Sequence, residues 1–88
     1  MTYSEIHRRI KNILDKEMRL FQISHSYTAN FYDDLGMSLW ELNLLLYKVE
    51  NHFGIELENG LEEKLNTINQ LVTLIHYEHH KKLAKAVA

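Results

Sequence analysis

Hydrophobic residues recur at helical spacing in several parts of the chain. Near the start, Ile6 and Ile10 are followed by further apolar residues three or four positions apart. Thr2 and Glu5 precede this pattern with the spacing of a capping box, in which each side chain bonds to the backbone of the other residue. The pattern therefore predicts a first helix over about residues 3–18.

A second capping pair, Ser38 and Glu41, begins a segment of helix-favouring residues that runs from Leu39 to Phe53 and stops at Gly54. This predicts the second helix. Its apolar residues form one stripe of Leu42, Leu45, Leu46 and Val49 and another of Trp40, Leu44 and Tyr47. The first stripe suits a core, whereas the second needs a partner or a covering segment.

The remaining elements follow from similar signals. A short helix is expected over about residues 61–65, and the capping pair Thr67 and Gln70 begins a third main helix. Residues 19–37 lose the helical period, which predicts a long loop. Its apolar residues would hold it against the bundle, and these are Phe21, Ile23, Tyr27 and Phe31. The predicted fold is all-α, a bundle of three main helices plus one short helix.

Composition narrows the function further. The 88 residues fit one domain, which we place at residues 1–80, followed by a basic helical extension or tail at 81–88. The absence of cysteine excludes disulfides and zinc-thiolate sites and suits a reducing cytoplasm. A net charge of −2 gives no basic field for nucleic acid. The start lacks a signal pattern, and no apolar run could span a membrane, so a cytoplasmic protein is expected.

Candidate catalytic and metal sites are weak. No nucleophile with a base and an orienting group can be assembled, so the chain is not expected to be an enzyme. His76 and His80 have the one-turn spacing that can chelate a transition metal. However, Lys81, Lys82 and Lys85 follow, and basic residues at a helix end are explained by the helix dipole. We therefore predict no metal, with His76 and His80 as the candidates if one binds.

The order of several landmarks resembles that of the acyl carrier protein family, and the resemblance covers nearly the whole chain. The landmarks are Ile6–Leu14, Phe31, Asp33–Gly36, Glu50–Ile55 and Thr67–Leu71. Each is weak alone, but their mutual spacing fits the family without a gap. The resemblance implies a four-helix bundle with a long first loop. It also implies a partner-docking face on the second helix.

In that family, a serine in an Asp-Ser-Leu motif at the start of the second helix carries a 4′-phosphopantetheine arm. The gap-free register puts Leu39 at this position, with Ser38 before it. A slip of one residue would instead make Ser38 the attachment site, with Met37 at the place of the aspartate. That slip would rotate the helix by about 100°. The gap-free register keeps the core stripe inward, and Ser38 is also explained as a helix cap.

The resemblance leaves three functions open. The favoured one is a non-catalytic docking module, without an arm, for a partner protein of acyl, fatty-acid or polyketide-type metabolism. The alternative is a working carrier with 4′-phosphopantetheine on Ser38, served by a phosphopantetheinyl transferase and acyl-handling enzymes. A further alternative is a self-associating structural domain, for instance a homodimer joined across a two-fold axis.

Any partner is expected on the outward stripe of the second helix. Trp40, Leu44 and Tyr47 form this surface, with Met37 and Leu39 beside it. Trp and Tyr are enriched at interface hot spots. Since the helix itself offers only two glutamates against one lysine, electrostatic steering should be weak. The opposing possibility is that the loop 19–37 folds over the stripe and buries it.

Overall fold

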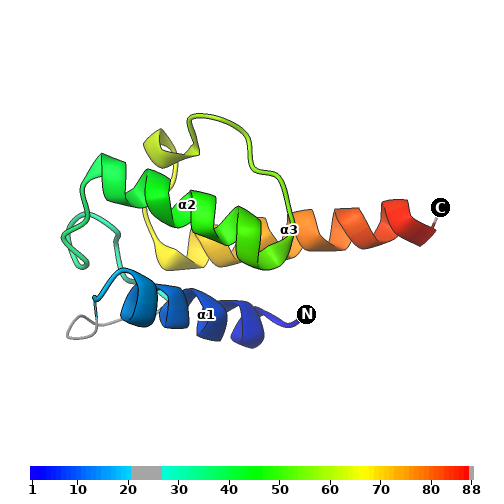
Figure 1. Ribbon diagram of the computed structural model, residues 1–88, viewed down its shortest axis with the longest axis horizontal. Coiled ribbons are helices and arrows are strands. Elements are labelled where there is room, and N and C mark those ends of the chain that lie inside the picture. The colour runs from blue at the N-terminus through cyan, green and yellow to red at the C-terminus, as the bar shows by residue number, and fades with distance from the viewer. Residues whose placement is uncertain (21–26, 88) are drawn as a thin grey trace.

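The computed structural model describes residues 1–20 and 27–87, and Figure 1 shows them as a helical bundle. The elements in chain order are α1 (Tyr3–Asn12), the π-helical turn η1 (Ile13–Glu17), α2 (Leu39–Phe53), the 3₁₀ turn η2 (Leu61–Glu63) and α3 (Ile68–Val87). No strand occurs within these described ranges. The expected all-α bundle with three main helices and one short helix is confirmed.

The first helix covers the expected residues but changes its winding. Thr2 caps it, because its hydroxyl accepts from the Glu5 amide at 3.1 Å. After Asn12 the chain widens into η1, where the amide of Met18 donates to the carbonyl of Ile13 at 3.1 Å. Arg19 ends the segment in a left-handed conformation with φ of 57°. Periodicity alone does not distinguish an α-helical last turn from a π-helical one.

The bounds of α2 agree with the prediction. The Ser38 hydroxyl accepts from the Glu41 amide at 3.1 Å, and the Ser38 amide donates to Glu41 Oε1 at 3.0 Å. At the other end, Gly54 adopts the left-handed conformation with φ of 64°. There the Lys82 ammonium of α3 donates to the Gly54 carbonyl. Both ends of α2 are therefore capped by specific partners.

The start of α3 is joined to the first loop. Thr67 and Gln70 form the predicted capping pair. The Thr67 amide donates to Gln70 Oε1 at 3.1 Å, and the Gln70 amide donates to the Thr67 hydroxyl oxygen at 3.3 Å. The amide of Ile68 donates to the Ala29 carbonyl at 3.0 Å, and that of Asn69 to the Tyr27 carbonyl at 2.8 Å. The loop carbonyls thus satisfy amides that a helix start leaves without partners.

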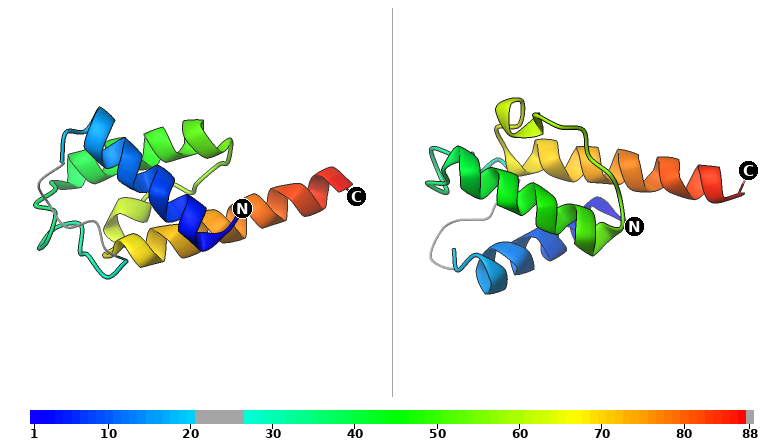
Figure 2. Two further views of the ribbon diagram at one scale, coloured as in Figure 1. Left: turned by 90° about the horizontal axis from the view of Figure 1, so that it is seen from below. Right: turned by 45° about the horizontal axis from the view of Figure 1, so that its top comes forward.

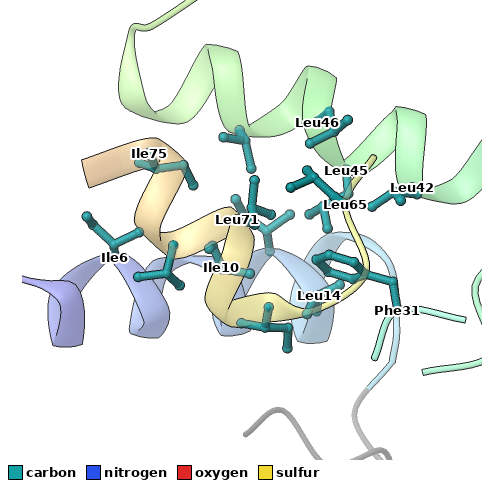
Figure 3. Close-up of a cluster of buried hydrophobic side chains, with 14 of the residues drawn as sticks. Ile6, Ile10, Leu14, Phe31, Leu42, Leu45, Leu46, Leu65, Leu71 and Ile75 are labelled. Atoms are coloured by element: carbon teal, nitrogen blue, oxygen red, sulfur yellow. The ribbon is translucent and has the colours of Figure 1, made fainter. Parts of the chain in front are cut away.

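The core lies between the three long helices, and Figure 3 shows its centre. Ile6 and Ile10 from α1, Leu45 from α2 and Leu71 from α3 are all fully buried. Phe31 enters from the loop and is also fully buried, as the sequence predicts. Tyr27 remains partly exposed and stacks on His7, with ring centres 4.1 Å apart. The other two loop residues expected to hold the loop, Phe21 and Ile23, lie outside the described residues.

The last turns of α3 extend beyond the end of α2 (Figures 1 and 2). The molecule measures 42 × 25 × 21 Å as a result. Residues 81–87, which the sequence assigns to a basic extension, continue the helix without a break. The domain boundary at residue 80 stays a prediction.

Candidate functional site

The start of α2 is positioned by a tight turn that precedes it. The Asn30 amide donates to Asp34 Oδ2 at 2.6 Å, and the Asn30 carbonyl accepts from the amides of Asp34 and Leu35. The Met37 amide then donates to the Phe31 carbonyl at 2.9 Å. Because Phe31 is fixed in the core, this bond sets where Ser38 lies.

Ser38 is exposed and has extended backbone angles, so it stands just before the first helical residue. Its oxygen accepts one hydrogen bond as the cap of α2. The hydroxyl keeps its own hydrogen as a donor. Ser38 is also the only serine or threonine between residues 29 and 66. Any chemistry on a serine or threonine hydroxyl in this region would therefore take place at Ser38.

Leu39 is the first residue of α2, and its side chain is about half exposed at 48%. Leu42, Leu45 and Val49 on the opposite stripe are fully buried. The core stripe of α2 therefore points inward, whereas Leu39 lies at the surface next to Ser38.

The outward stripe of α2 is exposed. Trp40 is 71% exposed and Tyr47 63%, while Leu44 is half-buried. The described part of the loop therefore does not cover the stripe. Met37 corrects the sequence prediction, because it is only 4% exposed and belongs to the core. The hydrogen bond from the Met37 amide to the Phe31 carbonyl holds this residue inward. Its position in the sequence, next to the stripe, does not indicate this bond.

A groove of about 480 Å³ runs beside this stripe, between α2 and the segment that contains η2. Trp40, Leu44 and Tyr47 line one side. Glu50, Glu58 and Glu62 add carboxylates. The two glutamates from the η2 segment lie beside α2 only because the chain folds back, so the surface is more acidic than α2 alone suggested.

A charged cluster joins η1 to α2. Glu17 contacts Lys48 at 3.2 Å and His52 at 2.7 Å. Desolvation raises the pKa of Glu17, but the hydrogen bonds and charges of Lys48 and His52 outweigh it, so the pKa lies below its ordinary value. No sequence pattern indicates this cluster, since Lys48 and His52 are 31 and 35 positions from Glu17.

The histidines of α3 stack rather than converge. The His76 ring lies 4.3 Å from the Tyr3 ring and 6.4 Å from the His80 ring, measured between centres. Among the described residues, no group of three or more His, Cys, Asp or Glu side chains is placed to hold a metal ion. None of the described helices is both long and apolar enough to cross a membrane.

Comparison with known proteins identifies the family. The chain is 31% identical over 77 residues to the acyl carrier protein of Buchnera aphidicola subsp. Acyrthosiphon pisum (strain Tuc7). The aligned region covers 88% of this chain and 96% of that protein. The chain belongs to the acyl carrier protein family. No protein-family model matches it.

Further relatives within the acyl carrier protein family are more distant. The acyl carrier protein of Buchnera aphidicola subsp. Schizaphis graminum is 27% identical over 78 residues, covering 89% of this chain and 99% of that protein. The acyl carrier protein of Thermotoga maritima is 27% identical over 71 residues, which are 81% of this chain and 88% of that protein. The resemblance based on the ordered landmarks is therefore confirmed. The chain is an acyl-carrier-protein-like domain, similar to carriers rather than to enzymes.

Proposed function

We propose that this chain acts as an acyl carrier protein, with Ser38 as the attachment site for 4′-phosphopantetheine. The single observation that carries the proposal is the exposed Ser38 hydroxyl at the start of α2, with no other serine or threonine nearby. The near-complete overlap with proteins named acyl carrier protein supports it. The sequence alone favoured a docking module without a phosphopantetheine arm, whereas the similarity to proteins named acyl carrier protein supports the carrier.

The residues around Ser38 fit a phosphodiester. The hydroxyl oxygen would form a new bond to the phosphate of coenzyme A that bears the pantetheine, adenosine 3′,5′-bisphosphate would leave, and a base of the transferase would take the hydroxyl proton. The resulting anion would lie at the N-terminus of α2, where helix amides and the dipole stabilise negative charge. Once attached, the arm supplies a thiol that holds acyl groups as thioesters.

The transferase and the acyl-handling enzymes would dock on the exposed side of α2. Trp40 and Tyr47 provide apolar contact area there, and Leu39 lies next to the attachment site. Large exposed aromatic side chains are the usual anchors of such interfaces. The proposed setting is the cytoplasm, as for the fatty-acid or polyketide-type pathways that use such carriers.

A second candidate is a docking module without an arm. The observation that favours it is the position of Leu39 as the first residue of α2, with Ser38 engaged as the cap. In this version the same face of α2 binds a partner protein of acyl metabolism. No covalent chemistry takes place on the chain.

Intact-mass measurement separates the two candidates. Purified protein is incubated with coenzyme A and a broad-specificity phosphopantetheinyl transferase, beside a control carrier that is known to be modified. The carrier proposal expects one phosphopantetheine adduct on the wild type and none on Ser38→Asp. Aspartate is chosen because it caps the helix but lacks a hydroxyl, so loss of the adduct would not reflect an unfolded helix start.

A third variant tests the register. Leu39→Ser in the Ser38→Asp background places an aspartate and a serine at the family's motif positions. If this variant is modified and the wild type is not, Leu39 holds the attachment position and the natural chain is the module without an arm. That pair of results would overturn the carrier proposal.

A further inference from the structure

Asn59 and Gly60 form a turn in the linker between α2 and η2, which runs along the edge of the molecule (Figure 1). Asn59 is the only asparagine in the chain that precedes a glycine. Its side chain is exposed, and Gly60 adopts a left-handed conformation with φ of 84°. A methyl group on the Gly60 Cα would meet no atom within 4 Å. The Asn59 side-chain amide can therefore approach the Gly60 nitrogen without a clash from a neighbouring side chain.

The linker is held on both sides of this turn but not at its centre. Before the turn, the Leu57 amide donates to Glu50 Oε2 of α2 at 3.1 Å. After it, the Gly60 carbonyl accepts from the Glu63 amide of η2 at 3.1 Å. Within the described ranges, no group hydrogen bonds to the Asn59 side chain or to the Gly60 N–H. The side-chain amide and the backbone nitrogen that follows it are therefore both available to react with each other.

Two other exposed asparagines show the contrast. Asn43 and Asn51 lie within α2, and neither precedes a glycine. Inside an α-helix, the amide of the following residue donates to a carbonyl four positions earlier. Its nitrogen is then held in the helical hydrogen-bond pattern and cannot turn toward the asparagine side chain.

We infer that Asn59 is a site of spontaneous modification, at which the folded chain converts a side-chain amide into a carboxylate by deamidation. The Gly60 nitrogen loses its proton to solvent and forms a bond to Cγ of Asn59. The bond between Cγ and Nδ2 breaks, and Nδ2 leaves as ammonia after it takes up a proton from solvent. The product is a five-membered succinimide ring that joins the two residues.

Water then opens this ring at either of its two carbonyl carbons. Addition at Cγ breaks the new bond to the Gly60 nitrogen and leaves an aspartate at position 59. Addition at the backbone carbonyl carbon leaves an isoaspartate, in which the main chain runs through Cβ and Cγ. The sum of the steps converts an amide and water into a carboxylate and an ammonium ion. No oxidant or reductant is needed.

The modification changes the groove beside α2. Asn59 lines this groove together with Trp40, Tyr47 and three glutamates. Deamidation adds a fourth carboxylate there and makes the net charge of −2 one unit more negative. The isoaspartate form also lengthens the backbone of the linker by one carbon atom. The inference goes beyond the proposed function and does not depend on whether Ser38 is modified.

Native isoelectric focusing of the full chain tests the inference. Folded wild type is incubated at neutral pH and sampled over several days. We expect a more acidic species to accumulate, and peptide mass spectrometry should place the new carboxylate at Asn59. Asn59→Gln should lose this species, because attack on the longer side chain requires a six-membered ring, which forms more slowly. Asn51→Gln, at an exposed asparagine in α2, should retain it.

A parallel wild-type sample in guanidinium chloride measures the reaction in the unfolded chain. We expect modification at Asn59 in the folded sample as well as in the unfolded one. Modification in the unfolded sample alone would overturn the inference, and so would a folded wild type that keeps a single charge form. An acidic species that accumulates equally in wild type and Asn59→Gln would also overturn it, because the new carboxylate would then lie elsewhere.

Discussion

Ser38 stabilises the fold whether or not it is modified. Its hydroxyl satisfies an amide of the first turn of α2 that would otherwise lack a partner. We expect Ser38→Ala to lower the free energy of unfolding by about 1 kcal/mol and Ser38→Asp to retain most of it. Urea unfolding followed by circular dichroism measures both. Equal losses in the two variants would contradict the role of the cap.

Glu17 should make stability depend on acid pH. Its pKa is lowered in the folded chain, so its charged form contributes stability that is present above about pH 4.5 and is lost as the pH falls through the folded-state value. Glu17→Gln should therefore destabilise the protein at neutral pH, by less than about 1 kcal/mol because the cluster is exposed. The difference from wild type should shrink toward about pH 3.

Unfolding curves at several pH values test this dependence. Glu56→Gln serves as the control, since Glu56 is an exposed carboxylate outside the cluster. A wild-type advantage over Glu17→Gln that is the same at every pH would show that the charge of Glu17 is not its source.

At the scale of the element, the end of α2 depends on Gly54. A side chain there would need a left-handed backbone, and its Cβ would lie 3.1 Å from the Lys82 ammonium. Gly54→Ala should lower stability by about 1 kcal/mol. Gly36→Ala is the matched control, because Gly36 has a similar φ of 63° but open space around its Cβ.

Thermal melts of Gly54→Ala and Gly36→Ala separate the cost of backbone strain from the cost of crowding against Lys82. A larger loss for Gly54→Ala than for Gly36→Ala would mean that displacing Lys82 adds a cost to the backbone strain. Equal losses would mean that the flexible lysine moves aside without penalty.

The start of a helix was predictable where its capping residues lie close together in the sequence. Ser38 and Glu41 lie three positions apart, so the start of α2 could be read from the sequence. The π turn of η1 could not, because apolar periodicity does not distinguish an α-helical last turn from a π-helical one. Lys82 likewise caps α2 from 28 positions away. Contacts between residues so far apart in the sequence produce no periodic pattern from which they could be predicted.

The candidate site was only partly predictable for the same reason. Trp40 and Tyr47 were placed on the exposed face correctly, since helical periodicity fixes their direction. Met37 was not, because the turn before a helix has no period. The acidic side of the groove comes from Glu58 and Glu62, which approach α2 only after the chain reverses.

At the scale of the whole molecule, Phe31 brings the first loop into the core that the helices share. It is fully buried in a domain with a single core. Phe31→Ala should cost about 3–5 kcal/mol, which is a large share of the stability of a small domain. Tyr77→Ala, at an exposed aromatic residue, should cost far less. Urea midpoints measure both, and similar midpoints would contradict the central place of Phe31.

The join between the first loop and α3 also bears on the order of folding. The carbonyls of Tyr27 and Ala29 pair with amides about forty positions later in the chain. Contacts so far apart in sequence close a large loop and are entropically expensive to form early. We therefore expect the helices to collapse first, whereas the turn that presents Ser38 reaches its final place against the core only when α3 has docked. A chain interrupted before residue 67 would contain the serine but not the geometry that presents it.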